Sequence, residues 1–165
     1  MNSAKRMAYS SMSVALCVLL MFLGAVLELG VYAAPMLCGV IIACVGERYA
    51  KGTSLSIFAA TAILCFILVP NIEENMMFAG ILGWYPIFKP KFDALPKYVR
   101  IIVKLLLFNT VTILIQAFLI NVLMPEVLTT TMIISLLVLA NITFILYDYC
   151  LPRMIYLFKR LLARF

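Results

Sequence analysis

Long apolar segments separated by short polar ones make up almost the whole chain. About 20 apolar residues are enough for a helix to cross the hydrocarbon part of a bilayer. The pattern predicts six such helices in one membrane domain over residues 1–165. Their predicted ranges are 7–29, 35–49, 53–69, 75–88, 98–124 and 127–149. We therefore expect an all-α integral membrane protein with six transmembrane helices.

Prolines mark several of the predicted boundaries. Pro70 ends the third apolar run, and Pro90 and Pro96 bracket a loop after the fourth. The ranges 35–49 and 75–88 are short for a full crossing. We expect these two helices to tilt little or to be shielded by their neighbours.

The pattern changes after Pro152. Arg153, Arg160 and Arg164 share one helical face, and apolar side chains such as Ile155 occupy the opposite face. This arrangement predicts an amphipathic tail helix over 152–164 that lies on the membrane surface. We expect it to bend away from the sixth helix at Pro152.

Composition agrees with a membrane location. The 165 residues are 66% hydrophobic and 12% charged, with a mean hydropathy of +1.15. A soluble domain carries about twice that charged fraction. The net charge of +6 does not indicate nucleic acid, because the basic residues form short clusters between apolar runs. Such clusters are typical of cytoplasmic loops.

The charges also predict the topology. With six helices, all 13 lysines and arginines fall on one side of the membrane. The other side carries only the carboxylates Glu28, Glu73, Glu74 and Glu126. Because cytoplasmic loops are enriched in lysine and arginine, both termini are expected in the cytoplasm of a multi-pass cell-membrane protein.

No pattern of catalytic or metal-binding residues is visible. The chain has five cysteines, without paired spacing, and no histidine, so we interpret the cysteines as small apolar packing residues. Hydrolase, metalloprotease and nucleotide-binding motifs are missing from the sequence. We expect neither an enzyme nor a bound metal or cofactor.

Two helical stripes are candidates for function. Asn109, Thr112 and Gln116 share one face of the fifth helix and should face the bundle interior, because an exposed amide is costly in lipid. Ala8, Ser11 and Ala15 form a stripe of small residues on the first helix. Such a stripe allows close approach of another helix, from this bundle or from a partner.

These features resemble one family of transport proteins. Six short helices with both termini cytoplasmic resemble the substrate-binding S-components of energy-coupling factor (ECF) transporters. The segment Ser11-Met12-Ser13-Val14-Ala15 is similar to the small-residue motif of that family, with serine in place of the usual first alanine. The segment Tyr147-Asp148-Tyr149, followed by Arg153 and a basic tail, is similar to the C-terminus of many members.

The resemblance implies a function in uptake. The protein would capture a vitamin or related micronutrient at the outer face. It would act with a separate transmembrane coupling subunit and two ATPases, and it would topple in the bilayer during transport. The stripe of Ala8, Ser11 and Ala15 would be the surface that meets the coupling subunit.

The resemblance also implies a substrate pocket in the outer half, under the link between the first two helices. The polar residues at matching depth are Glu28, Tyr32, Asn71, Glu74, Asn75, Gln116, Asn121 and Thr130. The acidic outer rim suggests a cationic or amine-bearing ligand, although the insertion rule alone also depletes outer loops of cations. The ligand itself is not indicated.

Two other functions remain open at this stage. One is a non-transport membrane protein, such as a scaffold or assembly factor. The other is a small stand-alone exporter with Glu28 as its coupling acid, although Glu28 lies at a helix end rather than at mid-helix.

Overall fold

A computed structural model describes residues 3–27, 32–122 and 130–162, and all of its elements in these ranges are helical. In chain order they are α1 (Ser3–Val26), α2 (Ala33–Arg48), α3 (Lys51–Leu68), α4 (Ile72–Met77), the π-helical segment η1 (Phe78–Leu82), α5 (Tyr85–Asp93), α6 (Lys97–Val122) and α7 (Thr130–Leu162).

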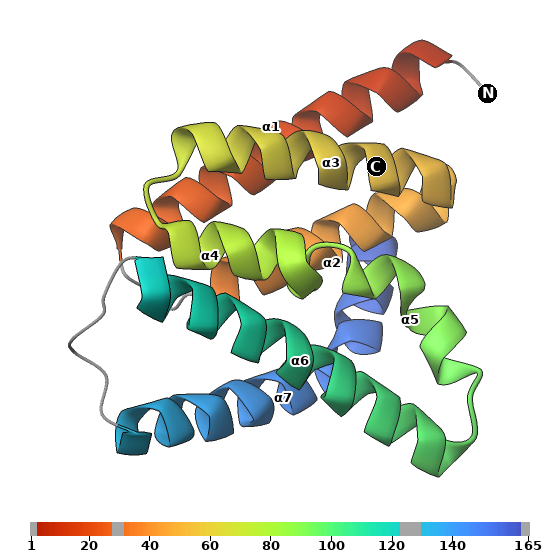
Figure 1. Ribbon diagram of the computed structural model, residues 1–165. Coiled ribbons are helices and arrows are strands. Elements are labelled where there is room, and N and C mark those ends of the chain that lie inside the picture. The colour runs from red at the N-terminus through yellow and green to blue at the C-terminus, as the bar shows by residue number, and fades with distance from the viewer. Residues whose placement is uncertain (1–2, 28–31, 123–129, 163–165) are drawn as a thin grey trace.

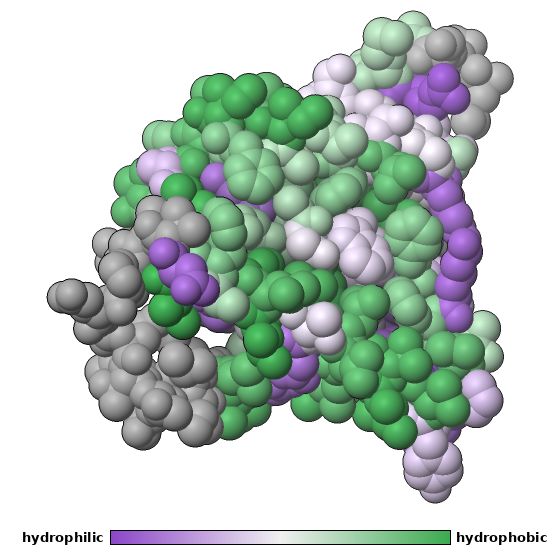
Figure 2. Space-filling model, in the orientation of Figure 1, coloured by the Kyte–Doolittle hydropathy of each residue, from purple (hydrophilic) through white to green (hydrophobic). Residues whose placement is uncertain are grey.

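Four helices in the described part of the chain are long and apolar enough to cross a membrane. The corresponding segments are Ala4–Val26, Lys51–Leu68, Lys97–Asn121 and Leu137–Leu157. Large apolar side chains such as Met12, Ile67 and Leu106 are exposed on them. Apolar residues cover most of the face in Figure 2. The all-helical membrane protein predicted from the sequence is confirmed at this level.

Helix α2 lies at the centre of the bundle (Figure 1) and contacts α1, α3, α4, η1, α5 and α7. Gly39 shows how closely these elements approach. A Cβ atom at Gly39 would lie 2.4 Å from the carbonyl oxygen of Leu82 in η1 and 2.8 Å from the Tyr147 hydroxyl in α7. Glycine is therefore required where α2 meets both elements.

The core consists of two apolar clusters on either side of this contact. In one, the rings of Phe108 and Phe144 stack with centroids 4.3 Å apart, and Tyr85 packs edge-on against Phe144. The other cluster joins α1, α2 and α3 through residues such as Cys17 and Ile42. Burial of these side chains fixes the positions of α5, α6 and α7 around α2.

The ends of the helices fall into two groups (Figure 1). The C-terminal ends of α1, α3 and α6 lie at the same end of the bundle as the first residues of α2, α4 and α7. We call this the α2 entry end. The N-terminal ends of α1 and α6 and the C-terminal ends of α2 and α5 lie at the opposite end.

The predicted helix 75–88 is instead three successive segments, α4, η1 and α5. The wide turn of η1 is closed by the Gly83 amide, which donates to the Phe78 carbonyl at 2.9 Å. The Trp84 indole N–H donates to the Gly80 carbonyl at 2.9 Å. Side-chain and π-type hydrogen bonds thus satisfy the backbone where the regular helix stops. Helix α5 then continues through Pro90, so the expected loop is shorter than predicted.

The separate tail helix over 152–164 is also corrected. Helix α7 runs without a break through Pro152 to Leu162. Its last part, dark blue in Figure 1, runs in a different direction from its first part. Pro152 has no N–H to donate to the Asp148 carbonyl. The Lys89 ammonium donates to that carbonyl instead, at 3.1 Å, so the helix continues with this acceptor satisfied.

Smaller differences concern the other boundaries. Helix α1 begins at Ser3, earlier than the predicted 7–29 helix. Residues 28 and 29 at the predicted end of that helix lie outside the described part, as do 127–129 at the start of the predicted 127–149 helix.

Candidate functional site

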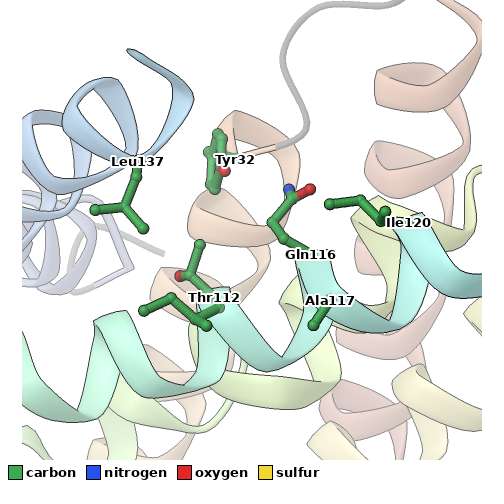
Figure 3. A pocket seen from close by; sticks show the side chains of 7 residues that line it. Tyr32, Thr112, Gln116, Ala117, Ile120 and Leu137 are labelled. Atoms are coloured by element: carbon green, nitrogen blue, oxygen red, sulfur yellow. The ribbon is translucent and has the colours of Figure 1, made fainter. Parts of the chain in front are cut away.

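A pocket of about 160 Å³ opens at the α2 entry end, between the start of α2, helix α6 and the first half of α7 (Figure 3). Its wall is mostly apolar. The residues that line it are Tyr32, Thr112, Ile113, Gln116, Ala117, Ile120 and Leu137. Mostly apolar pockets with a few polar groups are typical of small-molecule sites.

Three side chains supply the polar groups of this pocket. Thr112 is 2% exposed, and its hydroxyl oxygen has no hydrogen-bond partner among the described residues. The Gln116 amide nitrogen donates to Glu73 Oε1 at 2.8 Å, which fixes the amide at the pocket wall. Burial raises the pKa of the Tyr32 hydroxyl, and the nearby Glu73 carboxylate raises it further. Tyr32 therefore presents a neutral hydroxyl.

Of the eight predicted binding residues, Tyr32 and Gln116 line this pocket. Tyr32 immediately precedes α2 and Gln116 lies in α6, and both face the space shown in Figure 3. The pocket lies beside Tyr32, at the start of α2. The other predicted residues have different surroundings.

Asn71, Glu74 and Asn75 belong to the start of α4. The Asn71 side chain caps that helix by accepting the Glu74 amide at 3.2 Å. Asn75 donates to the carbonyls of Cys65 and Val69, at 3.2 and 2.9 Å, and so holds α4 against the end of α3. These two residues stabilise the α3–α4 corner rather than lining the pocket.

Glu74 is buried and points toward α1 instead of the rim. It is 1% exposed, and its Oε1 atom has no hydrogen-bond partner in the described chain. A Cβ atom at Gly24 would lie only 2.8 Å from that oxygen. Glu74 lies outside the four apolar spans. Burial raises its pKa to about 7 because the charged form loses hydration.

The last three predicted residues are not among the described residues that line the pocket. Asn121 is exposed, and its amide donates to the Ala117 carbonyl of its own helix at 2.7 Å. Glu28 lies outside the described residues. Thr130 begins α7, but its side chain is outside the described part.

The predicted docking stripe is exposed along α1. Ala8, Ser11 and Ala15 all face outward. Next to Ala15, a groove between α1 and α3 is lined by apolar residues that include Val18, Phe22 and Leu68. The stripe is therefore accessible to another helix rather than buried within this bundle.

A second cluster lies away from the pocket and joins α5, α6 and α7. Its centre is the Asp148 carboxylate, which accepts the Tyr85 hydroxyl at 2.5 Å and Lys104 Nζ at 2.9 Å. Lys89 forms an ion pair with the same carboxylate. Lys104 also pairs with Asp93 at 2.6 Å. We call these five residues the Asp148 cluster.

The two cations of the Asp148 cluster are strongly buried. The side chains of Lys89 and Lys104 are 9% and 6% exposed, whereas those of Asp93 and Asp148 are 37% and 25% exposed. Two lysines and two aspartates balance in charge. Buried charges are tolerated when they are paired and hydrogen-bonded, as here. The cluster ties the C-terminal end of α5 to helices α6 and α7.

Sequence reasoning missed this cluster. It treated the lysines as loop charges and used Asp148 as part of a segment similar to the C-terminus of the transporter family. One signal was available: Lys104 lies one to two turns inside an apolar helix, where a charge needs a partner.

The five cysteines behave as expected from their apolar surroundings. Cys17, Cys38, Cys44 and Cys65 are buried, and Cys150 is half-buried. The Cys38 thiol donates to the Cys17 carbonyl at 3.3 Å, within the core of α1 and α2. Among the described residues, no group of three or more acidic, cysteine or histidine side chains is arranged to hold a metal ion.

Comparisons with protein-family models, curated proteins and solved structures give no match to this chain.

Proposed function

We propose that this protein is a membrane-embedded substrate-binding subunit for uptake of a vitamin or related micronutrient. It would work with a separate transmembrane coupling subunit and two ATPases. The observation that carries the proposal is the pocket at the α2 entry end. It is partly apolar, contains a buried hydroxyl and an amide, and has the size of a small molecule.

The proposed orientation places the pocket at the outer face. The α2 entry end is opposite to the ends of α1, α2 and α6 that carry Lys5, Arg48 and Lys97. Cytoplasmic loops are rich in such residues. In this orientation both termini are cytoplasmic, and the predicted helices 35–49 and 75–88 complete six crossings. Reporter fusions test it: a fusion after Lys91 that reports an outside location would contradict the proposal.

The exposed small residues of α1 support a partner of the helical type. Ala8, Ser11 and Ala15 leave room for close helix packing, which is how helices associate in lipid. The groove beside Ala15 adds apolar contact area. We place the contact with the coupling subunit on this face.

Recovery of the working complex tests the function. Tagged protein purified from its native membranes should bring with it a larger membrane subunit and two ATPases, and reconstituted vesicles should show ATP-dependent uptake of one member of a vitamin panel. Ala15→Trp should abolish recruitment and leave ligand binding intact. Ala59→Trp, on the exposed face of α3, is the matched control and should recruit normally.

If no coupling subunit and ATPases are recovered with the protein, the two alternative functions, a stand-alone exporter and a scaffold or assembly factor, become the favoured ones. Export in the absence of ATPases would favour a stand-alone exporter. If the protein showed no transport and no ligand binding, a scaffold or assembly role would be favoured.

A further inference from the structure

The pocket at the α2 entry end also limits the chemistry of its ligand. We propose, on the basis of the proposed function, that it takes a neutral ligand with a single six-membered ring and one carboxamide-like polar group. Three features of the described residues support this inference: the pocket volume, the charges around it and the placement of its polar atoms.

The volume sets the size of the ligand. The pocket encloses about 160 Å³. An apolar cavity of about 150 Å³ accepts one benzene molecule. A single ring therefore fits this space, and a fused two-ring system would have to extend toward its open side. Aliphatic side chains such as Ile113, Ile120 and Leu137 supply the apolar walls.

The described lining favours a ligand without a full charge. No lysine, arginine, aspartate or glutamate is among the described residues that line the pocket. The neighbouring carboxylate of Glu73 already accepts the Gln116 amide. Glu74 is buried against α1. An anionic ligand would lose its hydration and be repelled by Glu73, and a cationic ligand would lose its hydration without meeting a carboxylate among the described lining residues.

The polar atoms predict a group that both donates and accepts. The Thr112 hydroxyl is buried and unpartnered, and a hydroxyl can serve as donor or acceptor. Thr112 and Gln116 are neighbours one turn apart on α6, and Tyr32 faces them from α2 (Figure 3). Because the Gln116 nitrogen is held by Glu73, its amide oxygen is the atom left to accept from a ligand N–H. A carboxamide at the ring edge satisfies both positions.

This inference departs from the cationic ligand suggested by the acidic rim. That expectation rested on four carboxylates. Glu28 and Glu126 lie outside the described residues, Glu74 is buried, and Glu73 is engaged with Gln116. A cationic probe in the test below separates the two ideas.

Titration calorimetry with four matched probes tests the inference on the chain alone, purified in detergent. Pyridine-3-carboxamide should bind. Pyridine-3-carboxylate, the 1-methylpyridinium-3-carboxamide cation and quinoline-3-carboxamide should each bind at least about tenfold more weakly, because they add a charge or a second ring. Binding of any of these three as tightly as the first, or no binding of the first, would overturn the inference.

Variants of α6 locate the site. Thr112→Val should weaken pyridine-3-carboxamide binding about tenfold, which is the effect of one hydrogen bond left unmade, and Thr112→Ser should restore it. Thr110→Val is the control, since Thr110 is exposed on the same helix. Unchanged binding by Thr112→Val would count against the proposed contact.

The outcomes also distinguish this inference from the proposed function. Probe binding that depends on Thr112, without recruitment of a coupling subunit, would contradict only the function. Recruitment and uptake of a charged or two-ring substrate would contradict only the inference.

Discussion

Replacement of Asp148 by asparagine should destabilise the bundle more than any other single change in the Asp148 cluster. Its carboxylate is shared by Lys89, Lys104 and Tyr85. Asparagine keeps the shape but removes the charge, so two buried ammonium groups share the single remaining carboxylate of Asp93. Removing one partner of a buried ion pair costs about 3–5 kcal/mol.

We expect a loss of about 3 kcal/mol, the lower limit of that range, because the Asp148 side chain is 25% exposed and Asp93 remains. Equilibrium unfolding by sodium dodecyl sulfate in mixed micelles measures it. The fluorescence of the single tryptophan, Trp84, reports the transition, since its indole packs against Phe88 within the bundle.

Two further variants make the test specific. Asp93→Asn should cost only about 1 kcal/mol, because Asp93 is 37% exposed and water screens its pairs. Adding Lys104→Met to Asp148→Asn should recover part of the loss by removing the surplus positive charge. A loss below about 1 kcal/mol for Asp148→Asn, or strictly additive losses in the double variant, would refute the reasoning.

Three other predictions use the same unfolding measurement. Gly39→Ala should lower the free energy of unfolding by about 2 kcal/mol, because the added Cβ atom clashes with the Leu82 carbonyl oxygen. Gly52→Ala should leave the free energy of unfolding unchanged, because a Cβ atom there meets no atom within 4 Å. Equal effects of the two changes would contradict the close packing of α2. The folded-state pKa of Glu74 is raised from 4.5 to about 7, so the contribution of Glu74 to stability should be complete below pH 4.5 and should fall between pH 4.5 and about 7. Glu74→Gln should abolish the fall in this range, and a fall there that survives the change would exclude Glu74 as the cause. Asn109→Leu should lower the free energy of unfolding by about 1–2 kcal/mol, because Asn141 Oδ1 loses its donor and the Asn141 amide nitrogen keeps only the Leu137 carbonyl. Asn109→Leu with Asn141→Leu should lower it less than the single change. A larger loss in the double variant would be inconsistent with reciprocal bonding.

The polar face of α6 could be predicted from the sequence alone. The spacing of Asn109, Thr112 and Gln116 places them on one side of a helix, and an amide in lipid must find a partner. In the structure Asn109 pairs with Asn141, Thr112 is buried, and Gln116 bonds to Glu73. Periodicity within one helix was sufficient for this prediction.

Pairing between distant helices could not be predicted in the same way. Asp148 meets Lys89 and Lys104 only because α7 crosses α5 and α6 at one position. Periodicity predicts on which face of its helix a residue lies, but not which residue of a neighbouring helix lies opposite it. The same limit explains why Asn71 and Asn75, which were predicted to line the pocket, bond to the α3–α4 backbone instead.

The π-turn of η1 escaped prediction for a local reason. Its apolar residues, Phe78 to Leu82, are equally compatible with an ordinary α-helix. The deviation depends on the contacts of Gly83 and Trp84 with the backbone, which no propensity scale contains.

Pro152 has an effect that extends beyond the shape of α7. By withholding one amide it turns a main-chain oxygen of Asp148 into a ligand for Lys89, beside the two oxygens of the side chain. A single residue thus offers three oxygen acceptors at one position of α7. We therefore expect the same pattern, an aspartate followed four positions later by proline in an apolar helix, at other sites where a membrane protein binds an ammonium group.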